Sequence, residues 1–120
     1  MSQNPSKKPH YPLAGVKAKI LAREYEITWK AQTTAKRDFR WGPDKIRKCL
    51  LKLNDRHYSA DKLRNHFYKW EKHRKYPNTM MDYYRARNIM DGMNVHIHLY
   101  IRNDDNKVII DSCHELDIYD

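Results

Sequence analysis

Glycine and cysteine are scarce in this sequence, and their scarcity excludes several kinds of site. The 120 residues include only three glycines, Gly15, Gly42 and Gly92, and each stands alone. The chain therefore has no glycine-rich loop to cradle a phosphate and no Gly-x-Ser-x-Gly turn to present a nucleophilic serine. Its two cysteines, Cys49 and Cys113, lie far apart, so neither a disulfide framework nor a Cys-x-x-Cys metal motif is expected.

Long apolar runs are also missing. No segment approaches the ~20 apolar residues that a membrane-spanning helix needs, and no secretory signal is recognisable. We therefore expect a soluble, cytoplasmic protein that has no membrane partner. Residues 1–8 are polar and expected to be disordered, whereas 9–120 should form a single domain, because a chain of this length with 40% hydrophobic residues can build one core.

Acidic residues are outnumbered, and they are unevenly distributed. The chain has 24 Lys and Arg against 15 Asp and Glu, a net charge of +9. Residues 1–87 hold 22 of the basic side chains, whereas residues 88–120 hold two basic and seven acidic ones. Nine tyrosines and three tryptophans add stacking surface for bases. This composition favours single-stranded RNA as a partner, although a basic surface that is merely well solvated is the alternative.

Helical periodicity dominates the first half of the chain. Three helices are predicted, over residues 12–23, over Trp29–Arg37 and onward from Pro43. Thr28 is suited to cap the second helix, and Pro43 occupies the first position of the third. A fourth helix is predicted over Ala60–Lys75, a run that contains the densest cluster of basic and aromatic residues.

Alternating apolar residues predict antiparallel strands in the rest of the chain. The strands are expected over Thr79–Arg87, Val95–Ile101 and Lys107–Ser112, the last continuing through residue 115. Asp91-Gly92 is a typical hairpin turn. The order of elements predicts an α+β domain in which N-terminal helices pack on a small antiparallel sheet formed by the C-terminal half.

The strand Val95–Ile101 carries the most informative pattern. Side chains two residues apart point to the same face of a sheet, so His96, His98 and Tyr100 share one face. His114 falls on the following strand. By contrast, Cys113 and His114 do not form a nucleophile–base pair, because adjacent strand residues point to opposite faces.

Three interpretations of these histidines remain open. The first interpretation is that they bind zinc, because a His-x-His pair on a strand with a third imidazole is plausible zinc geometry. Alternatively, they are half-exposed residues on the open face of a sheet without a chemical role. The third interpretation is general acid–base cleavage of RNA. Imidazoles suit the base and acid roles, and Lys or Arg suits the charge on the phosphorane, so no metal is needed.

Five short motifs follow one another along the chain. They are Pro9–Lys17, which contains Pro-His-Tyr-Pro-Leu, then Phe67–Lys69, Asp82–Arg85, Val95–Leu99 and Ser112–Glu115. In this order they resemble the MqsR family of bacterial toxin–antitoxin systems. That resemblance implies a RelE-like fold and a ribonuclease toxin that cleaves mRNA and is neutralised by a cognate antitoxin protein.

The resemblance also implies site residues, carried over position by position. Lys69 matches the lysine of the family's Phe-Tyr-Lys motif, and Met81 stands where the family has a catalytic glutamine. His96, His98 and His114 replace a tyrosine and two lysines of the family's later strands. The imidazoles preserve acid–base capacity at neutral pH. Because the family's Phe-Tyr-Lys lies at the sheet and not in a helix, His57-Tyr58 is the alternative counterpart of that motif.

The sequence therefore predicts a metal-independent endoribonuclease that acts on single-stranded mRNA without a cofactor. Catalysis is assigned to His96, His98 and Lys69, and Tyr84 is expected to stack on a base or orient a histidine. The residues expected to bind substrate are Arg85, Arg87, His114, Lys72 and Arg74. The alternative function is a degenerate toxin or regulatory module that binds nucleic acid without cleaving it.

Overall fold

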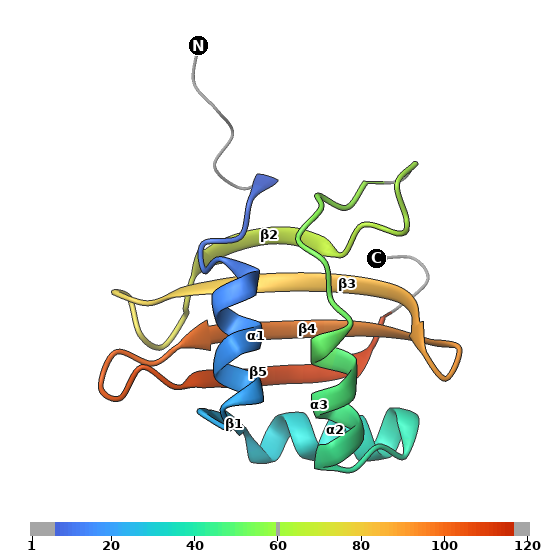
Figure 1. Ribbon diagram of the computed structural model, residues 1–120, viewed down its shortest axis with the longest axis horizontal. Coiled ribbons are helices and arrows are strands. Elements are labelled where there is room, and N and C mark those ends of the chain that lie inside the picture. Colours follow the sequence, from blue (N-terminus) through green and yellow to red (C-terminus); the bar gives the residue numbers. More distant parts are fainter. Residues whose placement is uncertain (1–6, 60, 117–120) are drawn as a thin grey trace.

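The computed structural model describes residues 7–59 and 61–116. The elements follow in the order α1 (Leu13–Leu21), β1 (Tyr25–Ile27), α2 (Trp29–Phe39), α3 (Pro43–Leu51), β2 (Phe67–Lys72), β3 (Met80–Met90), β4 (Met93–Ile101) and β5 (Val108–Glu115). The strands form one sheet in the order β1-β5-β4-β3-β2 (Figure 1). The predicted α+β class is confirmed. Apart from Lys7 and Lys8, the segment predicted to be disordered lies outside the described residues.

The sheet is mixed, because its edge strand β1, which comes from the N-terminal half of the chain, is parallel to its neighbour. Strands β2 to β5 pair antiparallel, whereas β1 runs parallel to β5. Hydrogen bonds continue the pairing beyond β1, from Val108 N to Glu24 O at 3.1 Å and from Thr28 N to Ile110 O at 3.1 Å. The sequence predicts only a connector here, since three residues of strand are too few to show alternation.

Helices α1 and α3 cross one face of the sheet (Figure 1). Each helix turns an apolar stripe toward the sheet, as a 3.6-residue period requires. The buried helical residues are Leu13, Val16 and Ile20 of α1, Ala31, Ala35 and Phe39 of α2, and Ile46, Cys49 and Leu50 of α3. They meet the apolar side chains of the strands, among them Val95, Ile97 and Leu99 of β4. Every second residue of β4 is thereby fixed on this face, and the histidines face away from the core.

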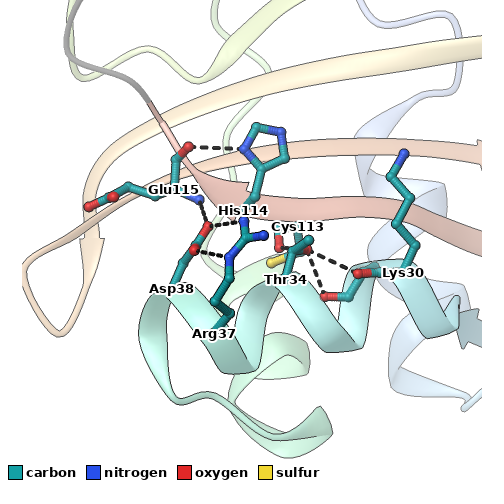
Figure 2. Close-up of polar contacts among 8 residues, drawn as sticks. Lys30, Thr34, Arg37, Asp38, Cys113, His114 and Glu115 are labelled. Atoms are coloured by element: carbon teal, nitrogen blue, oxygen red, sulfur yellow. Dashed lines mark hydrogen bonds and ion pairs between the residues drawn. The ribbon is translucent and has the colours of Figure 1, made fainter.

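Helix α2 runs along the edge of the sheet and protects β5. Because β1 ends opposite Ile110, the remainder of β5 would expose unpaired backbone groups. Thr34 donates its hydroxyl hydrogen to the carbonyl of Cys113 at 2.6 Å, and Asp38 accepts the amide hydrogen of Glu115 at 2.8 Å (Figure 2). Side chains of α2 therefore take the place of a further strand.

The predicted helix over Ala60–Lys75 is wrong. Residues 61–66 form turns and Phe67–Lys72 is strand β2, paired with β3. The apolar spacing that suggested a helix does not correspond to a buried stripe, since Leu63 is 43% exposed. Pairing with β3 buries Phe67 completely, and this tertiary contact outweighs the local pattern.

The other predicted elements are present with boundaries shifted by a few residues. Thr28 caps α2 by accepting the amide hydrogen of Ala31 at 3.1 Å. Asp91 and Gly92 have φ of 55° and 71°, as a two-residue type I′ hairpin requires. No helix in the described part of the chain is long and apolar enough to cross a lipid bilayer.

Candidate functional site

The face of the sheet that points away from α1 and α3 gathers most of the predicted site residues. Strand pairing places His96 between Arg85 of β3 and His114 of β5, and places His98 opposite Tyr83. Lys69 of β2 pairs with Tyr83 on the far side. We call this surface the histidine face and define it by Lys69, Tyr83, Arg85, His96, His98 and His114.

The two histidines of β4 are in direct contact. Their Nε2 atoms lie 3.2 Å apart, a hydrogen-bond distance, so one nitrogen donates and the other accepts. The Nδ1 atom of His96 is buried and has no partner among the described residues. One ring N–H therefore lies between the two Nε2 atoms and couples the two rings.

Burial and neighbouring charges keep this pair neutral. Burial is the main reason why the pKa of His96 falls to about 4, and His114, Arg85 and Lys69 lower it further. Burial likewise lowers the pKa of His98 to about 3, with contributions from His96, His114, Lys30 and Lys69. At pH 7 the pair is thus neutral: it does not supply a proton, and it is a weak base until an anion bound beside it raises its pKa.

His114 lies beside the pair but is held by a different contact. Its ring centroid is 5.0 Å from that of His96. Its Nδ1 lies 2.9 Å from the carbonyl oxygen of Glu115 (Figure 2). Because a carbonyl oxygen only accepts, Nδ1 carries the hydrogen, and Nε2 remains for other partners. Asp38 of α2 fixes the backbone at this point through the amide of Glu115.

Arg85 is a fixed cation with an unused donor. Its guanidinium carbon lies 3.6 Å from the centroid of the Tyr68 ring and 5.7 Å from that of Tyr58. These ring contacts orient the guanidinium and restrict its motion. Its Nε is buried and has no hydrogen-bond partner in the described structure. Arg85 pairs with His96 across β3 and β4, so its positive charge lies beside the histidine pair.

Lys69 and Tyr83 are joined through Glu71. Lys69 Nζ lies 3.3 Å from Glu71 Oε2 and 5.2 Å from the centroid of the Tyr83 ring. A hydrogen bond from the Tyr83 hydroxyl, with the charge of Lys69, holds the pKa of Glu71 below its usual range. Burial and Glu71 raise the pKa of Tyr83 to about 12, so its hydroxyl stays protonated. The Tyr83 ring packs on His98 with centroids 4.0 Å apart.

Two predicted site residues lie elsewhere. Tyr84 is fully buried on the opposite face, where its ring meets that of Phe67 with centroids 5.5 Å apart, so it neither stacks on a base nor orients a histidine. Lys72 pairs with Met80 and alternates with Lys69 and Glu71, which places it on the other side of the sheet. Both corrections follow from the two-residue period of strands. For Lys72 this period was not considered, because the segment Ala60–Lys75 was predicted to be a helix.

The remaining predicted residues lie at the rim of the histidine face. Arg87 donates from Nε to the Tyr58 hydroxyl at 3.4 Å. Arg74 is exposed in the loop after β2, and its charge lowers the pKa of nearby Glu71 after the larger effects of Tyr83 and Lys69. Met81, at the position of the family's glutamine, is buried in an apolar cluster with Tyr100 and Ile109.

Sequence reasoning missed Tyr83, although a signal for it was present. In a two-residue hairpin at Asp91-Gly92, Met90 pairs with Met93, and odd-numbered residues of the first strand then face even-numbered residues of the second. This parity puts Tyr83, and not Tyr84, on the same face as His98, and the register shift between Ala86 and Met90 sets it opposite His98. Tyr68 had no comparable signal, because it stands in the irregular pairing between Phe67 and Lys69.

The zinc interpretation required three ligands to converge. Within residues 7–59 and 61–116, no group of three or more His, Cys, Asp or Glu side chains is placed to hold a metal ion. The histidine face instead brings together a neutral imidazole pair, a third imidazole and two cations, Arg85 and Lys69. It can accept a proton and stabilise a nearby anion.

Comparison of the chain with known protein families found no family model that matches it, and no curated protein sequence matches it either.

Proposed function

We propose that the protein is an endoribonuclease that cleaves single-stranded RNA by attack of a ribose 2′-hydroxyl on the adjacent phosphate. The observation that carries this proposal is the contact between His96 and His98 beside the unused donor of Arg85. A neutral imidazole suits removal of the 2′-hydroxyl proton, and a guanidinium suits the charge that develops on the phosphorane. The step forms the 2′-oxygen–phosphorus bond and breaks the bond to the 5′-oxygen.

The contact between the two histidines changes how the roles are divided. A 2′-hydroxyl and a leaving 5′-oxygen lie on opposite sides of the phosphorus, so base and acid must approach from different directions. Two imidazoles whose Nε2 atoms are 3.2 Å apart cannot take both places. We assign the base role to the pair. The groups that flank the pair and can donate a proton to the 5′-oxygen are His114 on one side and Lys69 on the other.

The sequence resemblance supports the same proposal. The MqsR-like motif Phe67-Tyr68-Lys69 lies in strand β2, with Lys69 on the histidine face, and so the conflict raised by the predicted helix no longer applies. This placement favours Lys69 over His57-Tyr58 as the counterpart of the family lysine. The same resemblance supports a biological role as a toxin that stops translation and is neutralised by an antitoxin.

The direct test is incubation of the purified protein with a long RNA, with and without EDTA, followed by mapping of the ends. We expect cleavage in EDTA and products with 2′,3′-cyclic phosphate ends. The double variant His96→Ala/His98→Ala should lose cleavage, whereas His10→Ala, at an exposed histidine outside the histidine face, should retain it. Equal cleavage by the wild type and the double variant would falsify the assignment.

Single variants then identify the proton donor. If His114 is the acid, His114→Ala should lower kcat far more than Lys69→Ala does. If Lys69 is the acid, the opposite order is expected. Equal and small effects of both substitutions would show that neither residue donates the proton.

Binding without cleavage is the second candidate function. The observation that favours it is again the histidine contact, since a buried pair whose pKa values are about 4 and about 3 is a weak base at pH 7. This candidate predicts RNA affinity that falls steeply with salt, intact RNA after long incubation, and affinity unchanged in the double histidine variant.

A further inference from the structure

A cavity of about 410 Å³ opens at one end of the sheet, on the same side as the histidine face. It lies between the loop that joins β2 to β3 and the loop that joins β4 to β5, both at the left in Figure 1. Its size falls within the range of small-molecule sites, about 300–1,000 Å³. The residues that matter here are Tyr76, Asn78, Tyr100, Arg102 and Asn103, all of which line it.

The cavity follows the histidines along β4. Tyr100 is two residues after His98 and points to the same face, so it lies about 7 Å farther along the strand. That step is similar to the spacing of successive nucleotides in an extended single strand. An RNA strand bound with one phosphate at the histidine face can therefore bring a neighbouring base to this cavity.

The wall of the cavity is aromatic and partly exposed. Tyr76 is 50% exposed, whereas Tyr100 is 7% exposed, and their ring centroids are 6.4 Å apart. His73 packs against both rings, with centroids 4.8 Å from Tyr76 and 5.1 Å from Tyr100. Tyr76 thus offers an open ring that is supported from behind, which is what base stacking requires.

Both loops that form the cavity are held in place by their own hydrogen bonds. His73 Nδ1 accepts the amide hydrogens of Lys75 at 3.0 Å and Tyr76 at 3.3 Å. In the other loop, Arg102 forms ion pairs with Asp105 at 2.6 Å and with Glu26 at 2.8 Å. The cavity is therefore formed before any ligand arrives, which lowers the cost of binding.

The polar groups of the cavity suit a base better than a phosphate. The charge of Arg102 is neutralised by its two carboxylate partners, and Asp104 adds a negative charge at the lining. The side chains of Asn78 and Asn103 are exposed at the lining, and their amides can donate to or accept from a base edge. An anionic group would find less positive charge here than at Arg85.

We infer that this cavity is a nucleobase subsite, in which one base of a single-stranded RNA stacks on Tyr76 while its edge meets Asn78 and Asn103. This inference rests on the proposed function, since it takes RNA as the ligand and deepens that proposal by naming where the base next to the cleaved bond is held. It makes Tyr76 a determinant of binding and of the choice of cleavage position, and gives it no role in bond breaking.

The test measures binding of 2′-O-methyl tetranucleotides, which lack the attacking hydroxyl and stay intact. Fluorescence anisotropy at fixed salt compares the wild type with Tyr76→Ala, Tyr76→Phe and the matched control Trp29→Ala. Trp29 is an aromatic residue, 83% exposed, that lines a different cavity on α2. We expect Tyr76→Ala to weaken binding roughly 5- to 100-fold, the range for loss of one base–aromatic stack. Tyr76→Phe and Trp29→Ala should leave the affinity unchanged.

A tetranucleotide without bases separates stacking from phosphate contacts. The wild type and Tyr76→Ala should bind this abasic probe equally. The inference is overturned if Tyr76→Ala binds the normal probe as the wild type does, or if it loses the same affinity for the abasic probe. Cleavage of a long RNA decides the proposed function separately. If the protein cleaves RNA but Tyr76→Ala does not change binding, only the nucleobase subsite is refuted. If Tyr76→Ala weakens binding but the wild type does not cleave RNA, only the proposed catalysis is refuted.

Discussion

Two residues of the histidine face, Arg85 and His96, are held in place by neighbouring rings, and this determines what each can do. Arg85 is held over the Tyr68 ring, and His96 is held by His98. Both carry a buried nitrogen that no described residue satisfies, Nε in Arg85 and Nδ1 in His96. Leaving such groups unpaired costs roughly 1–3 kcal/mol each. A ligand that satisfies the Arg85 donor recovers that free energy, which favours binding of an anion at this point.

Arg85→Lys tests whether the guanidinium is needed for more than its charge. Lysine keeps the charge but loses the flat stack on Tyr68 and the fixed Nε donor. We expect kcat/KM for RNA cleavage to fall about 10- to 100-fold, in line with loss of one oriented donor to the transition state. Arg64→Lys, at an exposed position away from the histidine face, is the matched control. An Arg85→Lys protein as active as this control would show that charge alone is sufficient.

At the scale of elements, the contact between α2 and β5 links the edge of the sheet to the site. Thr34 and Asp38 satisfy backbone groups of Cys113 and Glu115, the residues on either side of His114 (Figure 2). The orientation of His114 toward His96 therefore depends on α2, whose Lys30 also adds positive charge near His98.

Thr34→Val keeps the shape of the side chain but removes its hydroxyl. The hydroxyl has one hydrogen, and its shortest contact is the carbonyl of Cys113 at 2.6 Å. Loss of this bond leaves the carbonyl of β5 unsatisfied, so we expect the free energy of unfolding to fall by about 1–2 kcal/mol. Urea denaturation measures it, with Thr33→Val, an exposed neighbour on the same helix, as the control. A loss no larger than that of Thr33→Val would mean that water replaces Thr34 at this edge.

For the whole molecule, buried ionisable groups make stability depend on pH in opposite directions. The pKa values of His96 and His98 are lowered to about 4 and about 3 in the folded protein. Their contribution to the free energy of unfolding is therefore present above the unfolded pKa near 6.5 and lost as the pH falls through the folded pKa values. Asp82 behaves oppositely. Burial raises its pKa to about 6, so its contribution is present below about 4 and lost as the pH rises through 6.

The double variant His96→Gln/His98→Gln isolates the histidine contribution. Between pH 7.5 and pH 5, the wild type should lose roughly 4 kcal/mol more unfolding free energy than this variant, about 2 kcal/mol for each histidine, because the unfolded histidines take up protons that the folded ones refuse. Asp82 is present in both proteins and cancels. Urea denaturation at the two pH values measures the difference, and His10→Gln provides the control. An identical pH dependence in the wild type and the double variant would contradict the burial of the pair.

Periodicity in the sequence determined most of the elements and the direction of the key side chains. The apolar residues of β4 alternate strictly, and burial of Val95, Ile97 and Leu99 leaves His96 and His98 no other side. The three helices and the Asp91-Gly92 turn likewise follow from local chemistry, namely caps, apolar stripes and positive φ. These features depend on near neighbours in the chain, so the sequence alone contains them.

Only the tertiary structure decided which residues meet. Strand β2 exists because Phe67 is buried against β3, although its own spacing resembles a helix. The pairing of Tyr83 with His98 and the stack of Arg85 on Tyr68 both depend on register between strands. Register is fixed by side chains packing across distant segments and by irregular pairing within β2 and β3, which no local pattern encodes.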